Sequence, residues 1–375
     1  MVLELFLGGA AVLWLSVFGY PLALAVLSRG RRRAPAAEAP LPEIAIVVPT
    51  LNEEPLIAAK LADLARTDYP RERRTILVVD GGSSDRTCAL VEREMERTAG
   101  LRLLRVERST GQADQVCRAL DHLPHEIVVV TDADALLEPG CVRALVEELR
   151  NDPGLAVAGA LVRPHTALLE ERLYWRALNH LWWLEGEALS SAMVSGACYA
   201  VRASAVPASC RAARALDVSL AAGAAARGLA ARLCRTARAT EVRVPQSTGE
   251  FMAFRRRRGP GYLHALLPAP GTAAPARWRV ARAMRLWHLL VVPRMAAVLA
   301  VAALALLGTP HWEWAVGTLF AFLGPALVLL GAAGAGEGPQ PWWRSGLAAA
   351  RLVGLTWMAL LALVPGRTLT PERPA

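Results

Sequence analysis

Several motifs that would assign a function directly are missing from this sequence of 375 residues. No GxGxxG follows the first expected strand and no GxxxxGK(S/T) occurs, which argues against a dinucleotide-dependent oxidoreductase and a P-loop NTPase. The six cysteines are scattered and form no CxxC pair, so neither a zinc site nor a disulfide framework is indicated. This cysteine usage fits a reducing compartment. We also find no internal repeat.

Long hydrophobic stretches are present, and hydrophobic residues make up 54% of the sequence, which indicates a membrane protein. A cleaved signal peptide is disfavoured, because the first stretch follows no basic residues and the arginines come after it. Two of the later stretches each carry one arginine, which can reach the headgroups from near a helix end. Four stretches are long enough to cross a bilayer: residues 5–28, 286–310, 314–336 and 345–366. We expect one transmembrane helix in residues 1–28, about three in residues 286–366, and a tail in residues 367–375.

The net charge of +9 does not indicate a nucleic-acid partner, because the basic residues cluster beside the apolar stretches. Arginines at 29 and 31–33 follow the first stretch, and arginines at 277, 279, 282 and 285 precede the second. This pattern is typical of the cytoplasmic flank of membrane helices and attracts anionic lipid. We therefore expect a linker in residues 29–42, a basic interfacial segment in residues 268–285, and a cytoplasmic domain between them in residues 43–267.

Residues 43–267 have the pattern of an α/β domain. Apolar runs at 44–49, 75–79, 101–106 and 127–131 predict buried strands. Helical spacing follows at 56–66 and 86–98, and a further helical stretch runs to residue 120. Strands that alternate with helices predict βαβ units and a mostly parallel sheet.

Polar side chains follow three of these strands, at the edge of the sheet where ligands bind in open α/β folds. They are Asn52 and Glu53 after the first strand, Asp80 after the second, and Asp132 with Asp134 after the strand at 127–131. Two carboxylates at a strand end suit a hard divalent cation that also binds phosphate oxygens. The alternative for each loop is ordinary turn or helix-capping chemistry.

The motifs VVPTLNEE, VVDGGSSDRT and TDADALLEPG, in this order, resemble the membrane-anchored inverting glycosyltransferases of family 2. The likeness covers most of residues 43–267. With its flanking apolar stretches, the chain is most similar to the cellulose-synthase-like and N-acetylglucosaminyltransferase-like subgroup. It implies the GT-A fold of nucleotide-diphospho-sugar transferases. It also implies that Asp80 contacts the nucleobase, that Asn52 and Glu53 lie near the nucleoside, and that Asp132 and Asp134 hold nucleotide and Mg²⁺ or Mn²⁺. Pro49, Gly81 and Ser83 belong to the same donor-binding loops.

The resemblance extends to the second half of the domain. Residues 194–202 are similar to the segment that lines the donor-sugar and acceptor site, which implies roles for Ser195, Gly196 and Ala197; the alternative is a buried strand with a glycine bulge. Asp217 matches the catalytic base, although Ala215 and Leu216 precede it where relatives often have Glu or Thr, and a helix N-cap is its alternative. Arg258 is the arginine of the run 255–258 that we expect to meet the diphosphate; a lipid-facing patch is the other reading of the run.

Three further features bear on the reaction. Gln112 stands where many relatives have lysine, and the Q-x-x-R-W signature of processive synthases is missing. Trp175 and Trp182 lie one heptad apart on one face of a helical stretch at 170–190, where they pack or contact an acceptor or the membrane interface.

The expected function is metal-assisted transfer of one sugar from a nucleotide donor, with uridine the expected base, to a lipid or membrane-held acceptor. The alternatives are a processive polysaccharide synthase and an inactive membrane scaffold.

Overall fold

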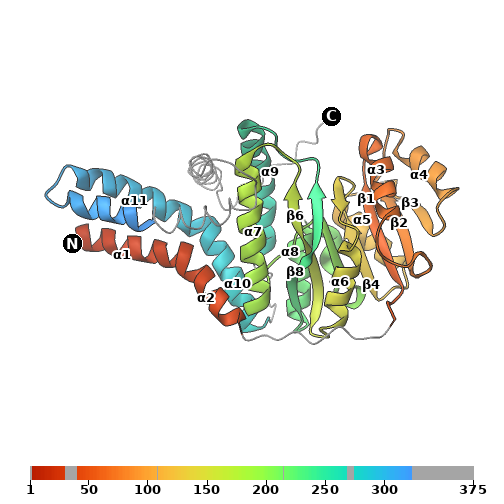
Figure 1. The fold of residues 1–375 in the computed structure, drawn as a ribbon, viewed down its shortest axis with the longest axis horizontal. Coiled ribbons are helices and arrows are strands. Elements are labelled where there is room, and N and C mark those ends of the chain that lie inside the picture. The colour runs from red at the N-terminus through yellow and green to blue at the C-terminus, as the bar shows by residue number, and fades with distance from the viewer. Residues whose placement is uncertain (1, 30–39, 108, 214, 268–273, 323–375) are drawn as a thin grey trace.

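The computed structural model of the protein describes residues 2–29, 40–107, 109–213, 215–267 and 274–322 (Figure 1). A globular α/β domain lies at one end, and a pair of long apolar helices extends from it at the other. The expected linker at 29–42 and the tail at 367–375 fall largely or wholly outside the described residues, as do 268–273 of the basic segment.

The domain is built on an eight-stranded sheet with the order β3-β2-β1-β4-β7-β6-β8-β5. The four strands from β3 to β4 are parallel, as the sequence predicts. The remaining half is mixed, because β7 runs antiparallel to both β4 and β6, and β5 runs antiparallel to β8. The expectation of a mostly parallel sheet is therefore correct only for the first half. The strands are β1 Ile44–Thr50, β2 Arg74–Asp80, β3 Leu101–Arg105, β4 Ile127–Thr131, β5 Ala135–Leu137, β6 Leu155–Pro164, β7 Cys198–Arg202 and β8 Ala230–Glu241.

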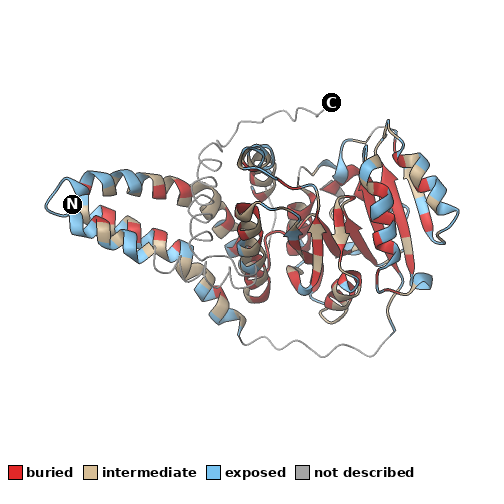
Figure 2. Cartoon of the chain, turned by 45° about the horizontal axis from the view of Figure 1, so that its top comes forward, coloured by how far each residue is buried: buried red, intermediate tan, exposed pale blue. Residues whose placement is uncertain are grey.

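The central strands are covered on both faces by helices, which explains their continuous apolar runs. Every residue of β1 and of β4 is buried (Figure 2). The helices that the sequence predicts at 56–66, 86–98 and 170–190 begin and end within about three residues of those ranges, and two further helices, at 141–150 and 248–266, have no predicted counterpart. The helices of the domain are α3 Glu54–Ala65, α4 Thr87–Met95, α5 Gln112–Asp121, α6 Cys141–Arg150, α7 Leu169–Ala188, α8 Leu216–Ala226 and α9 Thr248–Leu266, with short 3₁₀ turns η2 Arg71–Arg73, η3 Ala203–Ala205 and η4 Ala208–Ala212.

Two helical segments, Val2–Ser28 and Ala276–Leu307, are long and apolar enough to cross a membrane. They lie side by side through contacts between α1 and α11 (Figure 1). The second begins ten residues before the predicted stretch, because part of the basic segment is itself helical. Residues 312–322 begin another helix, but most of the predicted stretch 314–336 and all of 345–366 lie outside the described residues, so about four spans are not confirmed. The parts are α1 Val2–Trp14, η1 Leu15–Gly19, α2 Tyr20–Ser28, α10 Ala276–Leu286, η5 Trp287–Val291 and α11 Val292–Leu307.

A buried polar cluster joins these two segments to the α/β domain through α7. Glu185 accepts hydrogen bonds from the hydroxyl of Tyr20 at 3.0 Å and from the guanidinium of Arg285 at 2.7 Å. Arg285 also stacks over Trp182, and Trp182 makes an edge contact with Trp175, so the two tryptophans share a face as predicted. Since α2, α7 and α10 meet at one carboxylate, the domain is held in a defined position against the apolar helices.

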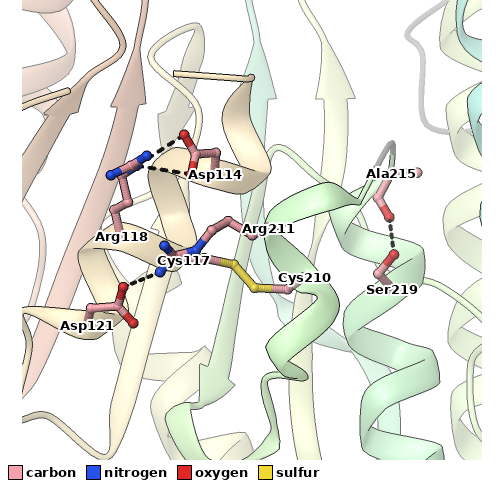
Figure 3. The surroundings of a disulfide bond; sticks show 8 residues. All are labelled: Asp114, Cys117, Arg118, Asp121, Cys210, Arg211, Ala215 and Ser219. Atoms are coloured by element: carbon pink, nitrogen blue, oxygen red, sulfur yellow. Dashed lines mark hydrogen bonds and ion pairs between the residues drawn. A yellow bond between two sulfur atoms is a disulfide. The ribbon is translucent and has the colours of Figure 1, made fainter. Parts of the chain in front are cut away.

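The expectation that the cysteines form no disulfide is wrong for one pair. Cys117 on α5 and Cys210 in η4 are bonded across 93 residues of sequence (Figure 3). An ion pair between Arg211 and Asp121 lies beside the bond and joins the same two segments. The pairing depends on the fold bringing distant segments together, and no local spacing of cysteines reveals it.

Candidate functional site

The loops that follow β1 and β2 are tied to each other. The backbone N–H of Asn52 donates to the hydroxyl of Ser83 at 2.8 Å, and Asn52 accepts from the N–H of Ser84 at 2.9 Å. Asp80 is buried and accepts from the N–H groups of Gly82 and Ser83 at 3.0 and 2.9 Å. Asn52 has a φ of 56°, which only a few residue types tolerate. The predicted donor residues Asn52, Asp80 and Ser83 therefore form one rigid unit.

Helix α5 supports this unit from behind. The carbonyl of Thr50 accepts from Gly81 N–H at 2.8 Å and from the side chain of Gln115 at 2.7 Å, and Pro49 pairs with Val79 in the sheet. A Cβ at Gly81 would lie 2.2 Å from the Gln115 amide nitrogen. The structure therefore gives Gly81 a packing reason, since glycine leaves room for the amide that holds the end of β1.

The loop that carries Asp132 and Asp134 rests on a buried lysine. Lys60 on α3 is fully buried and donates to the hydroxyl of Thr131 at 2.8 Å and to the carbonyl of Ala135. The neighbouring Asp63 accepts from Leu137 N–H at 2.9 Å. One turn of α3 thus fixes both ends of the acidic loop, a role that the sequence analysis did not identify.

The charges of three carboxyl groups, those of Glu241, Asp132 and Asp217, act on Arg258 of α9. Burial and the charge of Asp134 raise the pKa of Asp132 to about 7. Burial, together with the charges of Asp132 and Asp134, raises the pKa of Glu241 to about 8. The charge of Arg258 opposes both shifts. Glu241 is the last residue of β8, and it lies near Asp132 because β8 pairs with β5 at Ala135. The two paired residues are more than 100 positions apart, so no local sequence pattern predicts that Glu241 belongs to the site.

Asp132 and Arg258 border a pocket of about 230 Å³. It brings together five of the predicted site residues, namely Asp132, Gly196, Ala197, Asp217 and Arg258. The other lining residues are Gln112, Tyr199, Ala215, Leu216, Arg257, Gly261 and Tyr262. Ser195 does not line the pocket but supports a residue that does, because its hydroxyl accepts a hydrogen bond from the N–H of Ala197 at 3.3 Å. The predicted donor residues Pro49, Asn52, Glu53, Asp80, Gly81 and Ser83, and the predicted metal ligand Asp134, are not among the lining residues.

Asp217 faces the pocket from the first turn of α8. It is the second residue of the helix and not its N-cap, which is Ala215, so the alternative of a capping aspartate is not realised. Burial raises the pKa of Asp217 to about 6, while the Val218 N–H, the charge of Arg258 and a hydrogen bond with Tyr262 act in the opposite direction. A Cβ built on Gly196 would lie 4.0 Å from the Asp217 carboxylate. A buried carboxylate thus faces a bare stretch of backbone.

The four arginines at 255–258 divide between packing and the pocket. Arg255 pairs with buried Glu171 at 2.8 Å and stacks 3.5 Å from the ring centre of Tyr174. Arg256, Arg257 and Arg258 are all exposed, and Arg257 and Arg258 line the pocket. The reading of the run as a single lipid-facing patch therefore fails for Arg255.

Two further contacts link the loops of the site. Arg243, which follows β8, forms a two-pronged ion pair with Glu53 at 2.9 and 2.6 Å, so Glu53 is already held by a cation that the sequence analysis missed. Gln112 donates to the carboxylate of Asp132. The amide that replaces the lysine of many relatives therefore still contacts the acidic loop.

The carboxylates fit a divalent cation only in part. Burial and, after it, the charge of Asp134 raise the pKa of Asp132, and a hard cation bound by the oxygens of both carboxylates would stabilise their charged forms. Among the described residues no three side chains of His, Cys, Asp or Glu are grouped to hold a metal. A cation here would therefore need additional oxygens, such as those of a bound diphosphate.

Comparison with known sequences identifies the first part of the domain. Residues 45–197 match the family described as Glycosyl transferase family 2, which confirms the resemblance seen in the motifs. Asp217 and Arg258 lie beyond the matched residues. The match includes the strands β1 to β4 and the acidic loops that follow them.

Two curated relatives cover part of this chain. An N-acetylglucosaminyltransferase of Rhizobium meliloti (strain 1021) is 26% identical over 151 residues, which is 39% of this chain and 35% of the relative. A beta-monoglucosyldiacylglycerol synthase of Synechocystis sp. is 30% identical over 113 residues, which is 30% of this chain and 24% of the relative. The matches thus span about a quarter to a third of the length of these relatives.

One solved structure is similar over nearly the whole chain. It is a mannosyltransferase of Pyrobaculum calidifontis in complex with GDP-Man and Mn²⁺. The sequences are 25% identical, the TM-score is 0.69, and the likeness covers 95% of this chain and 99% of that one. The expected GT-A-type α/β fold is therefore confirmed, with a curled mixed sheet in place of a mostly parallel one.

Proposed function

We propose that this chain, whose residues 45–197 form a glycosyl transferase family 2 domain, is a membrane-bound inverting glycosyltransferase. It moves a sugar from a nucleotide-diphospho-sugar to a lipid or a membrane-held glycan. The observation that carries the proposal is the pocket in which Asp217 faces Gly196 and Ala197, beside Asp132 and Arg258. In this pocket the Asp217 carboxylate can act as a base, the backbone at Gly196 and Ala197 leaves room for a sugar, and the Arg258 guanidinium can bind an anion.

The reaction is a single displacement at the anomeric carbon. The Asp217 carboxylate takes the proton from the acceptor hydroxyl, and its raised pKa makes it a stronger base than an exposed aspartate. Attack from that side expels the nucleoside diphosphate from the opposite face and inverts the anomeric configuration. Arg258 pairs with the departing diphosphate, since guanidinium matches the geometry of phosphate oxygens.

The donor lies across the ends of the first strands. Asn52, Asp80 and Ser83 would border the nucleoside, and Asp132 with Asp134 would hold Mg²⁺ or Mn²⁺ near the diphosphate. When bound, the cation supplies positive charge that stabilises the charge developing on the leaving group. The Mn²⁺ and GDP-Man in the similar mannosyltransferase support a divalent ion and a nucleotide sugar.

The acceptor reaches the pocket from the membrane. Two apolar segments flank the domain, and the buried cluster at Glu185 fixes their position relative to α7. With arginines on the domain side of each segment, we propose that the domain lies in the cytoplasm, where nucleotide sugars are made. One relative is a beta-monoglucosyldiacylglycerol synthase, and its name supports a lipid acceptor.

The test is a screen of radiolabelled UDP- and GDP-sugars against membranes that contain the full chain, followed by lipid extraction. Label in the lipid phase, dependent on added Mg²⁺ or Mn²⁺, supports the proposal. Membranes with Asp217→Asn should give no product above vector background. Long polymer formed without added lipid would instead indicate a processive synthase. If no donor is hydrolysed or transferred, the chain would instead be the inactive membrane scaffold.

A further inference from the structure

Two tyrosines line the pocket in which Asp217 is the proposed base. Arg258 and Tyr262 are four residues apart on α9, so their side chains share one face of that helix. Both line the pocket together with Asp217, and Tyr199 of β7 lines it as well. Two phenols thus share this pocket with the carboxylate.

The two phenols differ in their hydrogen bonding. The Tyr262 hydroxyl donates a hydrogen bond to the Asp217 carboxylate. Tyr199 is 1% exposed, and its hydroxyl has no hydrogen-bond partner among the residues that the structure describes. The phenol that holds the Asp217 side chain therefore comes from α9 and not from β7.

The other hydrogen bonds of Asp217 come from its own helix. The backbone N–H groups of Val218 and of Asp217 itself donate to the carboxylate at the first turn of α8. Helix α8 also packs against α9, which brings Tyr262 to this turn. The carboxylate is therefore held from two elements, and only the bond from Tyr262 can be removed without changing α8.

Other ionisable groups surround this carboxylate. They are Tyr199 on β7, Arg257 and Arg258 on α9, Asp132 after β4 and Glu241 at the end of β8. The positive charge of Arg258 favours the charged form of Asp217, as the hydrogen bond from Tyr262 does. Burial also raises the pKa of Asp132 and of Glu241, so a test of Tyr262 must separate Asp217 from these two groups.

We propose that Tyr262 is a positioning residue of this site, whose hydroxyl holds one oxygen of the Asp217 carboxylate and leaves the other free for the acceptor hydroxyl. The inference rests on the proposed function, in which Asp217 is the base. A base must lie within hydrogen-bond reach of the proton that it takes, so its orientation matters as much as its charge. A hydrogen bond donated to a carboxylate also favours the charged form that accepts a proton.

The first test needs no activity. Thermal midpoints of the full chain are measured in phosphatidylcholine nanodiscs with EDTA, from about pH 4 to about pH 8, for the wild type, Asp217→Asn, Tyr262→Phe and the double variant. The gain in midpoint from Asp217→Asn, taken in each background, isolates this carboxyl from Asp132 and Glu241. In the wild-type background the gain should level off near pH 6, because the pKa of Asp217 is about 6.

In the Tyr262→Phe background the gain should level off about one pH unit higher, because the charged carboxylate has lost a hydrogen bond. Tyr199→Phe is the matched control for this shift, since it removes a phenolic oxygen from the same pocket with no hydrogen bond to lose. It should leave the pH of levelling off unchanged. The same pH in the wild-type and Tyr262→Phe backgrounds, or an equal shift in Tyr199→Phe, would overturn the proposal.

The second test follows transfer with the donor found in the screen. In Tyr262→Phe the rate below pH 6 should fall at least about tenfold, which corresponds to a shift of one pH unit, and the loss should be smaller near pH 8. Tyr69→Phe should keep the wild-type rate and profile, because Tyr69 does not line the pocket and its hydroxyl donates to the carbonyl of Pro42 at 2.6 Å.

The two tests separate failure of the inference from failure of the proposed function. A loss by the same factor at every pH would give Tyr262 a merely structural role and would overturn the inference, while transfer by the wild type still supports the function. If the wild type transfers no sugar, the proposed function fails, and the thermal midpoints still decide whether Tyr262 holds the Asp217 carboxylate.

Discussion

The ammonium group of Lys60 lies directly beneath Thr131 and donates to its hydroxyl at 2.8 Å. Lys60 is the only lysine in the sequence, and its side chain is fully buried. A second hydrogen bond, to the carbonyl of Ala135, places the same ammonium at the far end of the acidic loop. The two contacts together join the end of β4 to the start of β5 through one side chain of α3.

Replacing Lys60 by methionine keeps most of the volume and removes both hydrogen bonds. The buried Ala135 carbonyl would then lose a partner, and we expect the free energy of unfolding to fall by about 1–3 kcal/mol. Donor affinity should fall as well, because the loop of Asp132 loses its support. Arg66→Met, an exposed neighbour that also faces Asp63, is the control and should change stability by less than about 0.5 kcal/mol. Equal stability of Lys60→Met and wild type would contradict this role.

Asp217→Asn should lower the rate of transfer by about 10²–10⁴-fold, the range of a lost general base. In the wild type the carboxylate must be ionised to accept a proton, and its pKa is about 6. The rate should therefore rise with pH through about 6 and level off above it. A pH–rate profile under saturating substrate tests this, and a profile that falls with rising pH over that range would exclude Asp217 as the base.

The same substitution has a second expected outcome, on stability. A carboxyl group whose pKa is raised on folding stabilises the native state only at low pH, and this contribution is lost as pH rises through the interval between about 4 and 6. Asparagine carries no such penalty. The thermal midpoint of Asp217→Asn at pH 8 should equal or exceed that of the wild type, which also shows that lost activity is not lost folding.

Gly196 and Gly159 offer a matched pair of glycine substitutions. A Cβ on Gly196 meets nothing closer than the Asp217 carboxylate at 4.0 Å, so Gly196→Ala should fold normally and yet obstruct the pocket, raising the KM for acceptor or donor. A Cβ on Gly159 would lie 2.8 Å from both Leu233 and Val194, so Gly159→Ala should lower the thermal midpoint. Normal kinetics in folded Gly196→Ala would show that this glycine has no role in substrate binding.

Removal of divalent ions should stop transfer and weaken nucleotide binding. Without a cation Asp132 and Asp134 repel each other, and the diphosphate would face two carboxylates. Asp134→Ala should show the same loss at every Mg²⁺ or Mn²⁺ concentration, measured by titration of nucleoside diphosphate. Glu138→Ala, which removes a carboxylate outside the loop of Asp132 and Asp134, is the control. Full activity of the wild type in EDTA would argue for a metal-independent mechanism.

The cysteine pair tests the orientation of the domain. If residues 43–267 face the cytoplasm, Cys117 and Cys210 should be trapped as thiols in intact cells and should form their bond after oxidation of the purified protein. Loss of the bond should lower the free energy of unfolding by about 2–4 kcal/mol. Thiol trapping with mass spectrometry gives the answer. A fully formed disulfide in growing cells would place the domain in an oxidising compartment.

The first half of the domain follows closely from its sequence. The runs at 44–49 and 127–131 are apolar and β-branched because both faces of these strands are buried, and polar residues at their ends mark the ligand edge. Strands β5, β7 and β8 were harder to anticipate. Their directions depend on pairings with distant partners, such as Ala135 with Glu241, and no local pattern encodes these pairings.

The contacts missed at the site have the same origin. Arg243 and Glu53 are 190 residues apart in sequence, and Lys60 and Ala135 are 75 apart. Each residue alone is typical of an exposed loop or a helix surface. Only the fold reveals that one pair links two loops of the site and that the other supports its acidic loop.

A single buried amine also gives this protein a built-in chemical reporter. An amine-reactive ester finds no lysine to acylate while α3 stays packed against β4 and β5, so modification at position 60 records each transient separation of these elements. The rate of acylation, followed by peptide mass spectrometry, would measure how often the floor of the acidic loop opens. Nucleotide sugar that clamps this loop should slow the labelling without any engineered probe.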